Sequence, residues 1–236
     1  MIASGATRRT GAIGTGTMET MQRDDFLRPA LEVAPHLLGS LLSVDAPGGR
    51  VTIRITEVEA YHGVGVPGVR DAGSHARNGR TERNASMFGP PGHAYVYFSY
   101  GMHFAVNLVC SPEGSASGVL VRAGEVVAGA DVARERRSAR RAGTDVPADH
   151  LARGPGNVAQ ALGIRRETHD GRSLFAEPFS LQLPDRAVPT IASGPRVGVA
   201  GVAGGPEFPW RFWIPGEPSV SAFRPGRGAP RPVRRS

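Results

Sequence analysis

The sequence contains no lysine, and all 28 of its basic residues are arginine. It therefore offers no side-chain amine that could form a Schiff base, because the arginine guanidinium stays protonated at any working pH. A single cysteine, Cys110, excludes an intramolecular disulfide and a cysteine-based zinc cluster. Its surroundings, AVNLVC, are typical of a core strand, so we expect a buried and inert thiol.

Long apolar runs are missing as well. No segment approaches the roughly 20 residues of a membrane span, and residues 1–22 lack the apolar centre of a signal peptide. We therefore expect a soluble, intracellular protein without membrane contact. The net charge is +7 at pH 7 and the pI is about 10.8. This charge favours a polyanionic partner such as nucleic acid, but it fits a merely solvated cationic protein equally well.

The composition is that of a folded chain with many turns. Hydrophobic residues make up 40%, and 32 glycines and 20 prolines favour short strands over long helices. Residues 1–23 predict a disordered tail, residues 24–224 one domain, and residues 225–236 a basic, disordered Pro/Arg-rich tail. Antiparallel strands with short helices between them indicate a single α+β domain with one protruding β-hairpin. We expect strands at 41–45, 50–60, 93–99, 103–110, 118–124, 179–183, 196–199 and 210–214, and helices at 34–39, 126–142 and 154–162.

Two glutamates, Glu57 and Glu59, follow an apolar alternating segment. Counting in steps of two puts both on the face of Val51, Ile53 and Ile55. A carboxylate on an apolar face is costly unless it is paired or functional. An ion pair with Arg122, which lies in the apolar segment VLVRAGE, is one explanation. A general acid or base in a pocket of low polarity is the other.

The segment HAYVYFSYGMHFAVN, residues 93–107, predicts a β-hairpin. Gly101 fits the first central position of a two-residue type II′ turn. Tyr95 is explained as a core residue, whereas Tyr100 at the tip is hard to bury. In a basic protein an exposed tip aromatic suits a wedge between base pairs, or else a protein contact. Asn107 lies among apolar residues and needs hydrogen-bond partners.

Two segments are rich in arginine. The first, SHARNGRTERN, residues 74–84, has the composition of loops that bind anions or are simply solvated. The second, residues 134–141, is a further candidate for phosphate contacts. The first segment contains His75, Arg77, Arg80, Arg83 and Asn84.

Taken in order, these segments resemble the alkyladenine (3-methyladenine) DNA glycosylase family. The resemblance runs from about Phe26 to Phe223, nearly the whole predicted domain. Two positions depart from the family pattern: Asn157 replaces a basic residue found near a phosphate in some relatives, and His103 replaces an aromatic residue. The blocks that carry the resemblance are EVEAY, SHARNGRTERNASMFGPPG, YVYFSYGMHFAVN, VLVRAGE, ARGPGNVAQALGI and PRVGV.

The resemblance implies a role for each matching residue. Glu59 would be the general base that activates water, Arg122 would hold that water, and the backbone carbonyl of Val197 would be its third ligand. Three aromatic side chains would sandwich the flipped base, and one asparagine would crowd the exocyclic amine of normal guanine. The hairpin tip and the arginine-rich loop would contact DNA. The base-binding residues are Tyr61, His75, Tyr97 and Asn107, and the DNA-binding residues are Tyr100, Met102, Arg80, Arg83 and Asn84.

The activity implied is base excision. The protein would flip an alkylated or deaminated purine from duplex DNA, hydrolyse its N-glycosidic bond with water activated by Glu59, and leave an abasic site. We expect no metal or organic cofactor, a monomer, and a cytoplasmic location with the nucleoid. A non-catalytic binder of damaged DNA that uses the same hairpin wedge is the alternative, and an RNA-interaction domain is a weaker third. Neither alternative requires both a carboxylate and an aromatic cage.

Overall fold

The computed structural model of the protein describes residues 23–68, 70–99, 101–138, 146–184, 186 and 188–230. Its helices are short, and its strands are mostly brief except for two long ones. Five 3₁₀ turns lie among these elements in the described part, at Arg23–Leu27, Ala34–Leu37, Ala85–Phe88, Ala148–His150 and Val202–Gly204. The helices and strands are α1 (Ala30–Val33), β1 (Leu41–Ala46), β2 (Gly49–His62), β3 (Ala94–Ser99), β4 (His103–Val109), β5 (Ser117–Ala128), α2 (Ala130–Ser138), β6 (Ala152–Arg153), α3 (Pro155–Leu162), α4 (Arg166–His169), β7 (Phe179–Gln182), β8 (Ala192–Gly194) and β9 (Arg211–Trp213).

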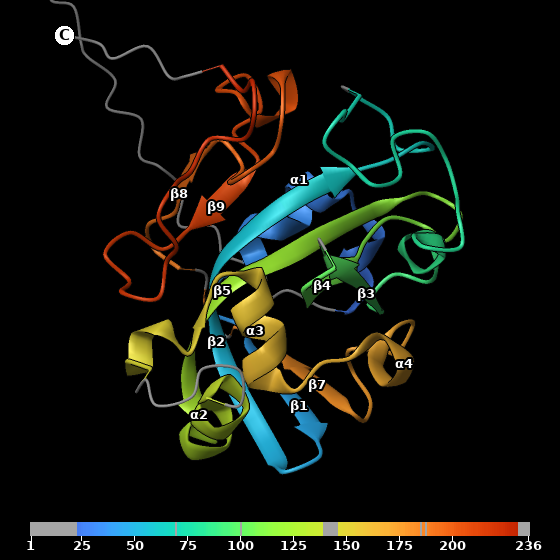
Figure 1. Cartoon of the computed structure of the whole chain (residues 1–236). Helices are drawn as coiled ribbons and strands as arrows, with labels where there is room; N and C mark the ends of the chain where they lie inside the picture. Colours follow the sequence, from blue (N-terminus) through green and yellow to red (C-terminus); the bar gives the residue numbers. More distant parts are fainter. Residues whose placement is uncertain are drawn as a thin grey trace, which may run out of the picture.

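These strands form one antiparallel sheet in a single α+β domain, as the sequence predicts. The main path is β3-β4-β5-β2-β1-β7, with β9 beside β2, β8 beside β9, and β6 beside β5. The long strand β2 pairs with β5 along its length, with β1 in its first half and with β9 in its second. Figure 1 shows β8 and β9 beside one end of β2, and α2 beside the β1–β2 turn at the other end.

The change of neighbour along β2 occurs at a β-bulge around Thr56. The register with β5 shifts between Ile55 and Glu57, and a bulge of this kind inverts the alternation of side chains beyond it. Val58 and Ala60 therefore join the apolar residues of the first half of β2 in the core. The prediction that both glutamates lie on that apolar face is wrong, because counting in steps of two does not hold across a bulge.

The main core packs apolar side chains of the sheet against α1 and α3. Cys110 is fully buried in it, as expected, and burial raises the pKa of its thiol. No helix within the described part of the chain has the length and apolar character needed to cross a bilayer.

The expected hairpin is present, with β3 at the edge of the sheet. Ser99 pairs with His103, so the loop has three residues, and the N–H of Met102 donates to the Ser99 carbonyl over 3.0 Å. Gly101 occupies the second central position of this turn with φ at 66°, a conformation that glycine adopts without steric cost. The predicted two-residue type II′ turn is therefore wrong. Tyr100 lies outside the described residues.

Three other predicted elements differ from the structure. The helix expected at 34–39 is a 3₁₀ turn at Ala34–Leu37, directly after α1, because Pro35 has no N–H with which to continue α-helical bonding. The helix expected from residue 126 begins only at Ala130, since Val126 still pairs within the sheet. Residues 196–199 form a turn and not a strand, because Gly198 adopts φ of 73°.

The boundaries of the folded chain also differ from those expected. Arg23 belongs to a 3₁₀ turn and not to a tail. The N–H groups of Gly198 and Gly201 donate to the carbonyls of Arg224 and Arg227 over 2.8 and 3.0 Å. The chain therefore remains packed beyond residue 224, where a tail was expected to begin. Residues 1–22 and 231–236 of the two predicted tails lie outside the described residues.

Candidate active site

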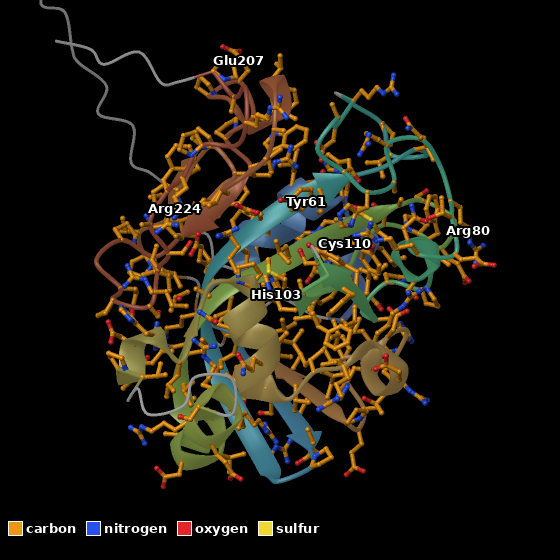
Figure 2. All side chains as sticks on the ribbon, viewed as in Figure 1. Tyr61, Arg80, His103, Cys110, Glu207 and Arg224 are labelled. Carbon is orange, nitrogen blue, oxygen red and sulfur yellow. The ribbon has the colours of Figure 1, made fainter. Side chains whose placement is uncertain are left out.

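A cavity of ≈720 Å³ opens on the face of the sheet opposite the main core. Alternate residues of β2, β4 and β5 reach it, while most of their sequence neighbours are buried in the core, and β3 contributes Tyr95 and the run from Tyr97 to Ser99. The loop around His75 and the turn at 197–200 complete its walls. Figure 2 places Tyr61 and His103, which both line the cavity, near the centre of the molecule. The sheet residues that line it are Glu59, Tyr61, Tyr95, Tyr97, Phe98, Ser99, His103, Asn107, Leu120 and Arg122.

Glu59 is fully buried at the wall of this cavity, and both of its carboxylate oxygens are held. Its Oε1 accepts the backbone N–H of Val197 over 2.6 Å, and Arg122 Nη1 lies 3.4 Å from the same oxygen. Its Oε2 accepts the hydroxyl of Tyr61 over 2.8 Å. The prediction placed the Val197 carbonyl near the reacting water, whereas the group that contacts Glu59 is the Val197 N–H.

The Tyr61 hydroxyl is a donor to Glu59 and stays protonated. Burial, followed by the charge of Glu59, raises the pKa of Tyr61 well above its ordinary value. Its ring lines the cavity, so one residue both fixes the carboxylate and offers an aromatic surface.

Arg122 connects Glu59 to a second buried carboxylate, Glu57. Arg122 Nε donates to Glu57 Oε1 over 3.0 Å, and Arg122 Nη2 donates to the Ser221 hydroxyl over 3.2 Å. Glu57 in turn accepts Arg211 Nε over 2.6 Å and the Ser221 N–H over 2.7 Å. Burial alone would lower the pKa of Arg122, but Glu59 and Glu57 raise it. Arg122 therefore stays charged, with Nη1 directed at Glu59.

His75 and Tyr97 form a second aromatic part of the lining. Their ring centroids are 4.5 Å apart at an interplanar angle of 88°, and Tyr97 stacks on Tyr95 at 5.4 Å. Nδ1 of His75 lies 3.2 Å from the Tyr95 hydroxyl. Burial, together with Arg83 and Arg77, lowers the pKa of His75, so its imidazole is neutral near pH 7. The cavity thus brings Tyr61, His75 and Tyr97 together, as the base-binding prediction requires.

Asn107 and Asn84 are both buried, but their surroundings differ. Asn107 lines the cavity, and its amide donates to the Tyr95 carbonyl over 3.4 Å. Asn84 is 2% exposed; its amide donates to the carbonyls of His75 and Gly79, and its oxygen accepts the Thr81 N–H. The prediction that Asn84 contacts DNA directly is therefore wrong, because its hydrogen-bonding groups are used inside the loop that carries His75.

Of the other described residues assigned to DNA contacts, only Arg83 lines the cavity. Arg83 lines the cavity and donates to the Phe98 carbonyl over 3.4 Å. Met102 is 59% exposed beside the hairpin turn. Arg80 is exposed and lies at the rim of the molecule, away from Tyr61 (Figure 2).

The arginines of α2 have other partners. Arg136 donates to four backbone carbonyls, those of Ala46, Pro47, Gly49 and Ala161, and Arg137 is buried against Gln160. Arg134 pairs with Asp131. The helix packs near the start of β2, whereas Glu59 and Tyr61 lie near its end. This cluster therefore does not adjoin the cavity; its residues 139–141 lie outside the described chain.

Sequence reasoning missed several residues around the site. Tyr95 was assigned to the core alone, yet it is buried and also lines the cavity. Asp71 and Arg196 form a fully buried ion pair. No local sequence pattern predicts it, because 125 positions separate the two residues. The one available signal is that Arg196 directly precedes Val197, a predicted site residue.

Comparison with known proteins identifies the family. The model of the methylpurine-DNA glycosylase family matches residues 24–218. A protein of Leifsonia xyli subsp. xyli is 51% identical over 208 residues, which cover 88% of this chain and 94% of its own length. A protein of Streptomyces avermitilis is 48% identical over 209 residues, 86% of this chain and 92% of its own. Both are provisionally named 3-methyladenine DNA glycosylase. The chain belongs to the methylpurine-DNA glycosylase family.

Proposed function

We propose that this protein is a base-excision DNA glycosylase that takes an alkylated or deaminated purine from duplex DNA and hydrolyses its N-glycosidic bond. One observation carries the proposal. Glu59 is fully buried beside a cavity with aromatic walls, and its carboxylate is fixed by Val197, Tyr61 and Arg122. A protein that only binds damaged DNA has no need for a carboxylate in that position.

The aromatic lining suits an extruded base. Enzymes that act on a base in a duplex take it out of the stack and hold it between aromatic or apolar side chains. Tyr61, His75 and Tyr97 would provide these surfaces, and a neutral His75 would not repel a cationic purine. Asn107 would crowd the exocyclic amine of guanine. Tyr100 and Met102 would fill the gap in the stack.

The reaction needs a positioned water molecule and a proton acceptor. Glu59 Oε2 accepts one hydrogen bond, from Tyr61, which leaves it a lone pair for water. The water oxygen would attack C1′ of the nucleotide while the bond from C1′ to the purine nitrogen breaks and its electron pair leaves with the base. Glu59 would take the proton from the water. A purine alkylated on a ring nitrogen is cationic and departs as a neutral molecule.

The absence of lysine predicts hydrolysis of the N-glycosidic bond without cleavage of the strand. A glycosylase that also nicks the strand attacks the sugar with an amine, and this chain has no lysine. Water is then the nucleophile, and the product is an intact strand with an abasic site.

The experiment uses purified protein and 5′-labelled duplexes that each contain 3-methyladenine, hypoxanthine, ethenoadenine or no lesion. We expect strand breaks at the lesion only after alkali treatment, and none in the undamaged duplex. Selective binding to lesion duplexes without abasic sites would support the non-catalytic alternative. Equal binding to all four duplexes and no abasic site would refute both.

A further inference from the structure

A buried arginine lies behind the ring of Tyr61. The Arg196 side chain is fully buried, and its guanidinium carbon is 4.4 Å from the centroid of the Tyr61 ring and 4.9 Å from that of Trp210. Tyr61 lines the cavity and Arg196 does not, so the tyrosine ring separates the guanidinium from the space where a base would stack.

Asp71 neutralises this arginine. Arg196 Nη1 donates to Asp71 Oδ2 and Arg196 Nη2 to Asp71 Oδ1, each over 2.7 Å, in a two-pronged ion pair that is fully buried. The two nitrogens also donate to the carbonyls of Ala60 and Ala203. The aspartate accepts the N–H groups of His62 and Gly73 as well. Both partners are thus fixed in place.

With this pair, the buried positive and negative charges around the cavity are equal in number. On the other side of Tyr61, Glu57 and Glu59 are matched by Arg122 and Arg211. Arg196 contributes one more buried positive charge near the base site, and Asp71 cancels it. Nearby, His62 has its pKa lowered by burial, against the charge of Asp71, and is neutral near pH 7. Loss of the Asp71 charge would therefore leave one uncompensated positive charge behind Tyr61.

That charge would act on a base stacked on Tyr61. Stacked rings have centroids about 4.5 Å apart or more, and the guanidinium lies a further 4.4 Å behind the ring. At the resulting separation of about 9 Å, and with an effective dielectric constant of about 20, repulsion between two unit charges corresponds to about a 20-fold loss of affinity. A purine methylated on N3 is cationic and would be affected. Hypoxanthine is neutral and would not be.

We propose that Asp71 is a specificity-determining residue for base charge: its carboxylate, paired with Arg196 behind Tyr61, makes the cavity compatible with cationic purines. The inference rests on the proposed function, since both kinds of lesion must reach this cavity. Asp71 would act on the base through its charge and not through direct contact.

The test measures dissociation constants for two duplexes whose lesion carries a 2′-fluoro sugar to slow cleavage, one with 3-methyladenine and one with hypoxanthine. The proteins are the wild type, Asp71→Asn, Arg196→Gln and the double variant. Asp71→Asn should lower the preference for 3-methyladenine over hypoxanthine by about 5- to 20-fold. Arg196→Gln leaves Asp71 unpaired and should raise the preference for 3-methyladenine over hypoxanthine. The double variant should return to within about twofold of the wild type.

A merely structural role gives a different result. Damage to the pocket or a smaller folded fraction weakens both duplexes together and leaves their ratio unchanged, and that outcome would overturn the inference. If Asp71→Asn does not fold, as thermal melting would show, an unchanged ratio in Arg196→Gln overturns it equally. A wild type that prefers neither lesion duplex over undamaged DNA contradicts the proposed function itself, which is a separate result.

Discussion

The backbone N–H of Val197 donates to Glu59 Oε1 over 2.6 Å, and the two residues are 138 positions apart in the chain. This bond ties the turn that follows β8 to the strand that carries the carboxylate. The next residue, Gly198, holds φ at 73° and donates its own N–H to the Arg224 carbonyl. The orientation of Glu59 therefore depends on a backbone turn as well as on side chains.

Gly198→Ala tests this dependence. A Cβ at this position meets no protein atom within 4 Å, so its effect on the protein itself comes through the left-handed backbone, at a cost of roughly 1–2 kcal/mol. We expect slower single-turnover excision. Gly171→Ala is the matched control, because Gly171 has φ of 71°, equally open surroundings, and no part in the cavity. Equal loss of stability with equal excision rates in the two variants would show that the turn does not position Glu59.

Glu57→Gln tests the second buried carboxylate. It would leave Arg122 and Arg211 without their shared partner, and removing one member of a buried ion pair costs about 3–5 kcal/mol. Glu125→Gln is the control on β5, since its pair with Arg54 is half exposed and such pairs are worth about 0–1 kcal/mol. Urea unfolding monitored by circular dichroism compares them. Similar losses of unfolding free energy in the two variants would contradict the assigned role of Glu57.

Acid should weaken the fold through its buried histidines. Burial lowers the pKa of His62 and His169, so below about pH 6.5 the unfolded chain binds more protons than the folded one. Stability is then lost progressively as the pH falls from about 6.5 toward the folded-state values. His62→Phe removes one of these groups and should make the fall in melting temperature between pH 7.5 and pH 5.5 shallower. An identical fall in variant and wild type would be the contrary result.

Two arginines of the segment 74–84, Arg80 and Arg83, should govern salt dependence. If Arg80 and Arg83 each neutralise one phosphate, the slope of log affinity against log salt changes by about 0.9 for each. Arg80→Gln/Arg83→Gln should therefore flatten the slope by up to about 1.8 for lesion and plain duplexes alike. Arg134→Gln on α2 is the control and should change nothing. A loss limited to lesion DNA would place these arginines in base recognition, as the position of Arg83 in the cavity lining makes possible.

Local patterns predicted most strands, whereas the residues that gather at the cavity were predicted from the family resemblance. Tyr95 shows their limit: its place in a strand predicts a core residue, whereas it lies on the cavity face with Tyr97, and Val96 and Val106 lie in the core. The face of Glu59 was mispredicted, because the bulge at Thr56 arises where β2 exchanges one neighbouring strand for another. A single sequence does not reveal such an exchange.

The sequence also did not reveal which residues pair over long distances in the chain. Nothing near Asp71 indicates Arg196, and nothing near Glu57 indicates Arg211 or Ser221, since each pair forms only when the C-terminal segment returns to the sheet. Asn84 was assigned to DNA because its loop is polar. Its burial follows from three backbone groups that need its amide.

The central claim is that Glu59 activates the water that releases the base, and Glu59→Gln tests it most directly. The amide keeps the shape of the side chain and can still accept the Val197 N–H, but it cannot take a proton. Single-turnover excision of a lesion from duplex DNA should fall by about 10²- to 10⁴-fold, while the dissociation constant for the same duplex stays within about threefold. Excision by Glu59→Gln at close to the wild-type rate would contradict the account.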